Sequence, residues 1–141
     1  MSRILLASME KSMSAILTKL MKTEGYKVVP ATDAAKANDL LKADSYDLLV
    51  ATAGKDAEAD MAVEVISFCQ VQRPEVPIIA IVENDGGKTA ERLSQFKLFM
   101  CLEKPLKVDQ LVSSVQKAID QGASIAAGNA NLQLEACYQF D

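Results

Sequence analysis

Short apolar runs alternate with amphipathic stretches along most of the chain. Five runs have the length and continuity of buried parallel strands: RILLA (3–7), YKVVPA (26–31), YDLLVAT (46–52), VPIIAIV (76–82) and LFMCLE (98–103). Each run is followed by a segment in which apolar residues recur with helical spacing. Five β–α units in strict alternation predict an α/β domain with a parallel sheet and helices on both faces.

The predicted helices cover 9–26, 32–44, 60–72, 88–96 and 108–120. Thr32 or Asp33 fits as the N-cap of the second helix, and Asp60 fits as the N-cap of the third. Pro30 predicts that the second strand lies at an edge of the sheet, or ends there. One stripe of the first helix is predicted to face the sheet: Met13, Ile16, Leu17, Leu20 and Met21.

Length and composition bound the organisation of the chain. Its 141 residues fit one domain, expected at 1–121, and the Ala/Gly/Asn-rich segment 122–141 is expected to be a tail, either a short extra helix or partly disordered. No apolar run could span a bilayer, and the N-terminus lacks a signal-peptide layout, so a cytoplasmic protein without a membrane partner is expected. The net charge of −4 and the scattered basic residues argue against nucleic-acid binding.

The residue types exclude several kinds of chemistry. The chain has no histidine, which removes the commonest general base, and its three cysteines, Cys69, Cys101 and Cys137, have no CxxC spacing. A zinc site or a thiol–imidazole pair is therefore not expected. We predict no enzymatic activity, no metal and no cofactor.

Three stretches of the chain resemble the receiver domain of two-component response regulators. They are RILLAS at the start, EGYKVVPATDAAKANDLLKADSYDLLV from the first helix into the third strand, and RPEVPIIAIVE leading into the fourth. The most specific piece is LEKP, where Lys104-Pro105 matches the lysine–proline step of the family. The resemblance covers Ser2 to Asp120 and implies the flavodoxin-like (CheY-like) doubly wound fold, with five parallel strands in the order 2-1-3-4-5.

The resemblance also implies where the reactive residues of a receiver would fall. The acid pair that helps hold Mg²⁺ falls on Ser8 and Met9, and the phosphoacceptor aspartate falls on Thr52. The Thr/Ser position falls on Val82 and the switch aromatic on Cys101, so that only Lys104 matches. Mg²⁺ needs oxygen ligands that usually include carboxylates, and the transferring phosphoryl group needs its charge neutralised. The sequence therefore predicts a degenerate, or pseudo-, receiver.

Other acidic residues are candidates to replace the missing phosphoacceptor aspartate. Asp47 begins the third strand, at the opposite end of the sheet from the site, and Asp56 lies in the loop beyond that strand. Asp56, Glu58 and Asp60 together are typical of a solvated acidic turn before a helix. Thr52 could be esterified only by a separate kinase, and a small polar residue closing a strand is the favoured interpretation. Lys104 is expected to pair with Glu10, Asp56 or Glu83, or to point to solvent.

The leading hypothesis is a stand-alone receiver-like protein of bacterial signalling that acts in trans on another signalling protein without phosphorylation. The resemblance implies contact, or homodimerisation, through the face of the fourth helix, fifth strand and fifth helix. That face carries Arg92, Gln95, Lys97, Gln110, Ser114 and Lys117. Two alternatives remain open: an atypical phospho-receiver in a phosphorelay, and a pseudo-receiver that binds a small molecule in a pocket lined by Ser8, Met9, Thr52 and Val82.

Overall fold

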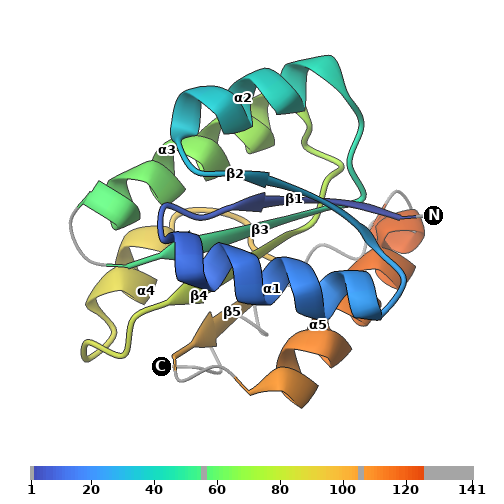
Figure 1. Ribbon diagram of the computed structural model, residues 1–141. Helices are drawn as coiled ribbons and strands as arrows, with labels where there is room; N and C mark the ends of the chain where they lie inside the picture. The colour runs from blue at the N-terminus through green and yellow to red at the C-terminus, as the bar shows by residue number, and fades with distance from the viewer. Residues whose placement is uncertain (1, 55–56, 105–106, 126–141) are drawn as a thin grey trace.

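The computed structural model describes residues 2–54, 57–104 and 107–125, with side chains through Asp120. Five strands and five helices alternate (Figure 1). The strands are β1 (Arg3–Ala7), β2 (Lys27–Ala31), β3 (Leu48–Ala53), β4 (Ile78–Val82) and β5 (Met100–Glu103). The helices are α1 (Lys11–Thr23), α2 (Ala34–Ala43), α3 (Ala57–Gln72), α4 (Lys88–Leu93) and α5 (Val108–Ile125).

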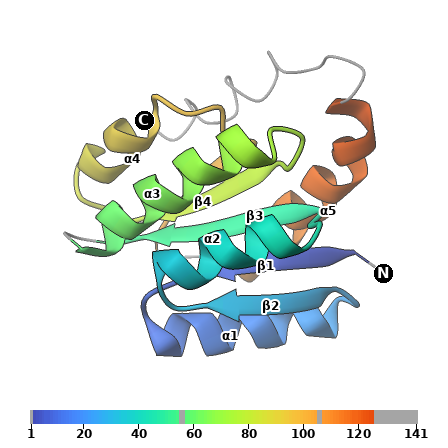
Figure 2. The ribbon, with the colours of Figure 1, turned by 90° about the horizontal axis from the view of Figure 1, so that it is seen from above.

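All strand pairs are parallel, and the order is β2-β1-β3-β4-β5. This confirms the predicted topology. β2 lies at the edge of the sheet, as Pro30 indicated, because proline has no N–H to donate to a second neighbouring strand (Figure 2). β3 is central and buried at every residue, which explains why its apolar run is continuous rather than alternating.

Two apolar layers hold the helices on the sheet. On one face α1 and α5 contribute Leu17, Met21 and Leu111 to a core with alternate strand residues. On the other face α2, α3 and α4 pack over the remaining strand residues, with Leu41 and Leu93 among the buried side chains. Burial raises the pKa of the Cys69 thiol on α3 to about 12, and the nearby Glu75 adds to this. The thiol is therefore a packing group at neutral pH.

Several local predictions are confirmed by the backbone and its caps. The Asp33 carboxylate accepts a hydrogen bond from Lys36 N at 2.7 Å, which makes it the N-cap of α2. Gly25 follows α1 with φ +92°, the left-handed conformation that glycine adopts without a Cβ penalty, and its N–H donates to the Lys22 carbonyl. Arg73 follows α3 and donates to the Leu41 and Lys42 carbonyls at the end of α2.

Three predictions need correction. Ile16 is 58% exposed, because the buried face of α1 is centred on Leu17 and Met21 and Ile16 lies one residue, about 100°, around the helix toward solvent. α3 begins at Ala57, so Asp60 lies in its first turn and is not its N-cap. α5 continues to Ile125, five residues beyond the predicted end of the fifth helix at 120. The rest of the predicted tail lies outside the described residues.

Candidate functional site

The pairing register aligns the carboxyl ends of the strands at one edge of the sheet. Ala7 of β1 is opposite Ala51 of β3, and Val82 of β4 is opposite Glu103 of β5. Residues that follow these pairs therefore meet at that edge. In this way the fold brings together Ser8, Thr52 and Lys104, which the sequence placed at a common site. In open α/β sheets this edge is where ligands and reacting groups usually lie.

Thr52 is the centre of a small buried network at this edge. Its side chain is 1% exposed, and Ser8 is fully buried beside it. Thr52 Oγ1 lies 2.8 Å from Ser8 Oγ and 3.1 Å from Glu58 Oε1. The single Thr52 hydroxyl proton is directed toward Ser8 Oγ and Glu58 Oε1, and the Ser8 hydroxyl in turn donates to the Glu10 carbonyl at 3.3 Å. The threonine hydroxyl is thus fully used inside the protein.

Glu58 belongs to this site, although the sequence pattern indicated that it lies in a solvated turn. It lies in the first turn of α3, where a carboxylate also complements the helix dipole. Its carboxyl group folds back over the end of β3 because Gly54 leaves room for it. A Cβ built on Gly54 would lie 2.7 Å from Glu58 Cδ. The sequence signal was the glycine between Thr52 and Glu58, which removes the side chain that would otherwise keep the carboxylate away.

Lys104 finds its partner on the neighbouring strand. Its Nζ donates to Glu83 Oε1 at 3.1 Å, and the two side chains are 18% and 30% exposed. Of the partners expected for Lys104, Glu83 is confirmed. Backbone hydrogen bonds hold both residues in place, since Lys104 N donates to the Val82 carbonyl and Glu83 N donates to the Ala53 carbonyl. The lysine is therefore paired with a carboxylate at the carboxyl ends of β4 and β5 rather than left as an open cation.

The other predicted site residues do not form one cavity lining with Thr52. Val82 and Cys101 are buried in the sheet, whereas Met9 is 41% exposed and turns toward solvent. Asp47 lies at the opposite end of the sheet, as expected, where its carboxylate accepts from Arg3 N at 2.8 Å. Asp56 and Pro105 lie outside the described residues.

The loop after β4 is organised by its own aspartate. The Asp85 carboxylate accepts from the Thr89 hydroxyl at 2.6 Å and from Thr89 N at 3.2 Å. The hydrogen bond from the Thr89 side chain lowers the pKa of Asp85, because it favours the ionised form. Gly86 and Gly87 have φ of +76° and +87°, the left-handed conformation that glycine favours in a turn, and they lie directly before α4. Asp85 therefore serves the start of α4 and is not directed at Thr52.

Most residues predicted on the face of α4, β5 and α5 are exposed, but the prediction for Ser114 is wrong. Gln95, Lys97, Gln110 and Lys117 are exposed. Ser114 is only 4% exposed, because it lies beside Val115 on the side of α5 that packs on the sheet, so it cannot contribute to an outer surface. Arg92 is partly engaged inside the protein, since its Nη2 lies 2.8 Å from Asp60 Oδ1 of α3.

In the part of the chain that the structure describes, the groups that interact around Thr52 and Lys104 at the carboxyl edge are two hydroxyls, the Glu58 carboxylate and the Lys104–Glu83 ion pair. Among the described residues, no group of three or more His, Cys, Asp or Glu could hold a metal ion. The donors present at Ser8 and Met9, a hydroxyl and an exposed thioether, do not fit Mg²⁺. Within the same described part of the chain, no helix is long and apolar enough to cross a membrane.

Comparison with curated proteins finds two transcriptional regulatory proteins. No family model matches the sequence. The chain is 25% identical over 124 residues to the transcriptional regulatory protein GlrR of Escherichia coli K12, and equally to the transcriptional regulatory protein QseF of E. coli O157:H7. These alignments cover 86% of this chain but only 27% of either relative. The chain thus spans about a quarter of the length of the curated proteins it matches.

Solved structures share the whole fold. A response regulator receiver domain protein from Clostridium thermocellum superposes with a TM-score of 0.78 at 16% identity, covering 89% of this chain and 99% of that one. The signal receiver domain of an HD domain-containing protein from Pseudomonas fluorescens Pf-5 gives 0.78 at 20% identity, covering 87% and 98%. The chain therefore has the CheY-like fold of receiver domains, and its length from β1 through α5 corresponds to one such domain.

Proposed function

We propose that this chain is a receiver-like signalling module that acts by binding another signalling protein and is not itself phosphorylated on an aspartate. One observation carries the proposal. The end of β3, where the resemblance puts a phosphoacceptor aspartate, holds a buried threonine whose hydroxyl is bonded to Ser8 and Glu58. A carboxylate does lie there, but it comes from α3 and acts as the partner of Thr52.

The electrostatics of this edge support the proposal. Phosphoryl transfer depends on cations that neutralise the charge spread over the transferring oxygens. Here Lys104, the lysine that the resemblance puts at the site, already pairs with Glu83, and Ser8 and Met9 offer no carboxylate for a metal. The Glu58 carboxylate would repel an incoming phosphoryl group next to Thr52. These three features act in the same direction against the receiver reaction.

We propose that a partner binds to the exposed face of α4 and α5 and not to the carboxyl edge of the sheet. The exposed side chains of α4, the following loop and α5 include Gln95, Lys97, Gln110 and Lys117. We propose this face as the site where a partner or a second copy of the chain docks. Because Ser114 is buried, the surface is narrower on α5 than the sequence indicated.

The decisive experiment is incubation of the full chain with acetyl phosphate and Mg²⁺, followed by mass spectrometry of the intact protein. A phosphorylatable receiver domain serves as the assay control. We expect no phosphorylated species of this chain and no change in intrinsic tyrosine fluorescence with beryllofluoride. Mg²⁺-dependent labelling would overturn the proposal, and peptide mapping to Asp56 would favour an atypical phospho-receiver instead.

A further inference from the structure

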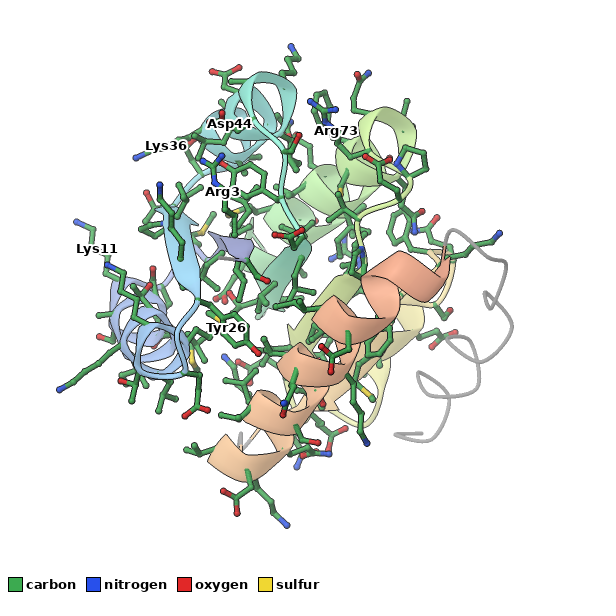
Figure 3. The ribbon with its side chains drawn as sticks, turned by 90° about the vertical axis from the view of Figure 1, so that its right-hand side faces the viewer. Arg3, Lys11, Tyr26, Lys36, Asp44 and Arg73 are labelled. Carbon is green, nitrogen blue, oxygen red and sulfur yellow. The ribbon has the colours of Figure 1, made fainter. Side chains whose placement is uncertain are left out.

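A groove of about 730 Å³ runs along α1 beside the edge strand β2 and reaches the first turn of α2, and its lining includes neither Thr52 nor any residue of α4 or α5. Four lysines line it, Lys11, Lys19 and Lys22 from α1 and Lys36 from α2, and no acidic residue does. Figure 3 shows Lys11 and Lys36 on the same side of the molecule, on the two helices that flank β2. We call this surface the α1–β2 groove.

The charge of the α1–β2 groove is opposite to that of the chain. The chain has a net charge of −4, yet all the charged residues lining this groove are lysines. Within the described part of the structure, the ion pairs involve Arg3, Arg92 and Lys104, and none of the four groove lysines takes part. The groove is therefore a locally positive site whose cations have no internal counter-charge, which favours an anionic occupant.

One hydroxyl in the groove lacks a partner, and a second hydroxyl lies close to it along the helix. Ser14 is only 7% exposed. Thr18 Oγ1 is buried without a hydrogen-bond partner among the described residues. Both line the groove, one helical turn apart on the same face of α1. By contrast Thr23, on the same helix, donates to the Lys19 carbonyl at 2.8 Å.

An unpaired buried hydroxyl is unfavourable, and a ligand that accepts its hydrogen bond removes that cost. Ser14 and Thr18 lie between Lys11 and Lys22 along the helix, so two hydroxyls, of which that of Thr18 has no partner among the described residues, lie among cations without counter-charges. A ligand with several acceptor groups spaced along its length would satisfy both. The same reasoning gives no such role to Thr23, whose bond is already made.

The shape of the groove selects an elongated ligand. Lys11 and Lys22 are separated by eleven residues of helix, which is about 16 Å, and about five residues of extended peptide span the same length. Pro30 has no N–H on the edge strand, which disfavours a peptide that adds to the sheet by main-chain bonds. Recognition must therefore come mainly from the side chains of α1 and α2.

From these observations we propose that the α1–β2 groove binds an extended acidic peptide segment of a partner protein, with lysine–carboxylate pairs at both ends and a hydrogen bond from Thr18 between them. The inference rests on the proposed function in one respect, that the chain acts by binding a protein. The site is separate from Thr52, so a chain that becomes phosphorylated would refute the proposed function and leave this binding test unaffected.

The test uses the full chain and fluorescence anisotropy of a short labelled peptide of alternating Glu and Leu. A matched peptide with Gln in place of Glu is the ligand control. The variant Lys11→Gln/Lys22→Gln removes two groove cations, and Lys88→Gln/Lys107→Gln, exposed residues elsewhere, makes the same change in net charge. We expect about tenfold weaker binding for the groove variant, no loss for the control variant, and binding that weakens as salt increases.

A hydroxyl variant tests the second half of the site. Thr18→Val keeps the shape of the side chain and removes its hydroxyl. It should weaken binding of the Glu peptide severalfold and leave the fold intact. Equal binding of the Gln peptide, equal losses in both lysine variants, or no binding at all would overturn the proposal. Tripolyphosphate that competes with the peptide at similar concentration would also overturn it, in favour of a phosphate ligand.

Discussion

The carboxyl edge around Thr52 and the α1–β2 groove contain similar hydroxyl side chains in opposite bonding states. At the edge, Thr52 is bonded to Ser8 and to Glu58, and Lys104 is paired with Glu83. In the groove, Thr18 has no partner among the described residues. The edge is where the fold usually carries chemistry, yet its polar groups are satisfied internally. The position of a residue in the fold identifies a candidate site. Polar or charged groups without a hydrogen-bond or ion-pair partner identify where a ligand could still bind.

The largest expected effect comes from putting a carboxylate back at the end of β3. Thr52→Asp would bury a second negative group beside Glu58 at a position that is 1% exposed. We expect a loss of roughly 3 kcal/mol in the free energy of unfolding at pH 7, measured by urea denaturation. Acetyl phosphate should still not label this variant.

The control is Thr52→Asn, which has nearly the same shape without the charge and should cost roughly 1 kcal/mol. Burial and Glu58 raise the pKa of the new aspartate above its value in the unfolded chain. Its penalty is therefore small below the unfolded pKa, near 4, and grows as the pH rises. If the free energies of unfolding of the two variants differ by the same amount from pH 4 to pH 8, then burial and Glu58 do not disfavour a second carboxylate at position 52.

An intermediate effect is expected from the glycine that admits Glu58. Gly54→Ala places a Cβ against the Glu58 carboxyl group and should displace it from Thr52. In a double-mutant cycle with Glu58→Ala, we expect a coupling free energy of about 1 kcal/mol, the usual worth of one hydrogen bond. Chemical denaturation of the four proteins measures it. Additive effects would mean that Gly54 and Glu58 act independently.

The smallest expected effect is an increase in the free energy of unfolding, from a substitution in the α1–β2 groove. Thr18→Val removes a buried hydroxyl that has no partner, so we expect a gain of about 0.5 kcal/mol or more in the free energy of unfolding. Thr23→Val, in the same helix, removes a hydroxyl that is bonded and should instead be neutral or slightly destabilising. Thermal unfolding of both variants gives the comparison, and a clear loss of stability in Thr18→Val would mean that its hydroxyl is paired in solution.

Much of the fold followed from the sequence because its signals are local. Continuous apolar runs such as YDLLVAT (46–52) predict buried parallel strands, and Asp33 is followed by an amphipathic segment that needs a cap. The errors came where a local pattern has two solutions. Asp60 can cap a helix or lie in its first turn, and Ile16 lies close enough to the apolar stripe to be assigned to it.

The candidate site was predictable only in its residue types. The sequence by itself determined that hydroxyl, thioether and aliphatic groups stand at positions 8, 9, 52 and 82, because those identities need no coordinates. It also determined that Lys104 follows the fifth strand. Which of Glu10, Asp56 or Glu83 would pair with that lysine depended on strand order and register, and the alignment of Val82 with Glu103 selected Glu83.

Tertiary structure alone decided the bonding state of the two regions. Glu58 reaches Thr52 because α3 begins early and Gly54 has no side chain, a relation of backbone position that no spacing in the sequence states. The α1–β2 groove exists because an edge strand leaves one side of α1 and α2 uncovered, which brings Lys11 and Lys36 to one surface. Charge and hydrogen-bonding capacity are properties of residues, whereas satisfaction of that capacity is a property of neighbours, and neighbours are fixed only when the sheet and helices have packed.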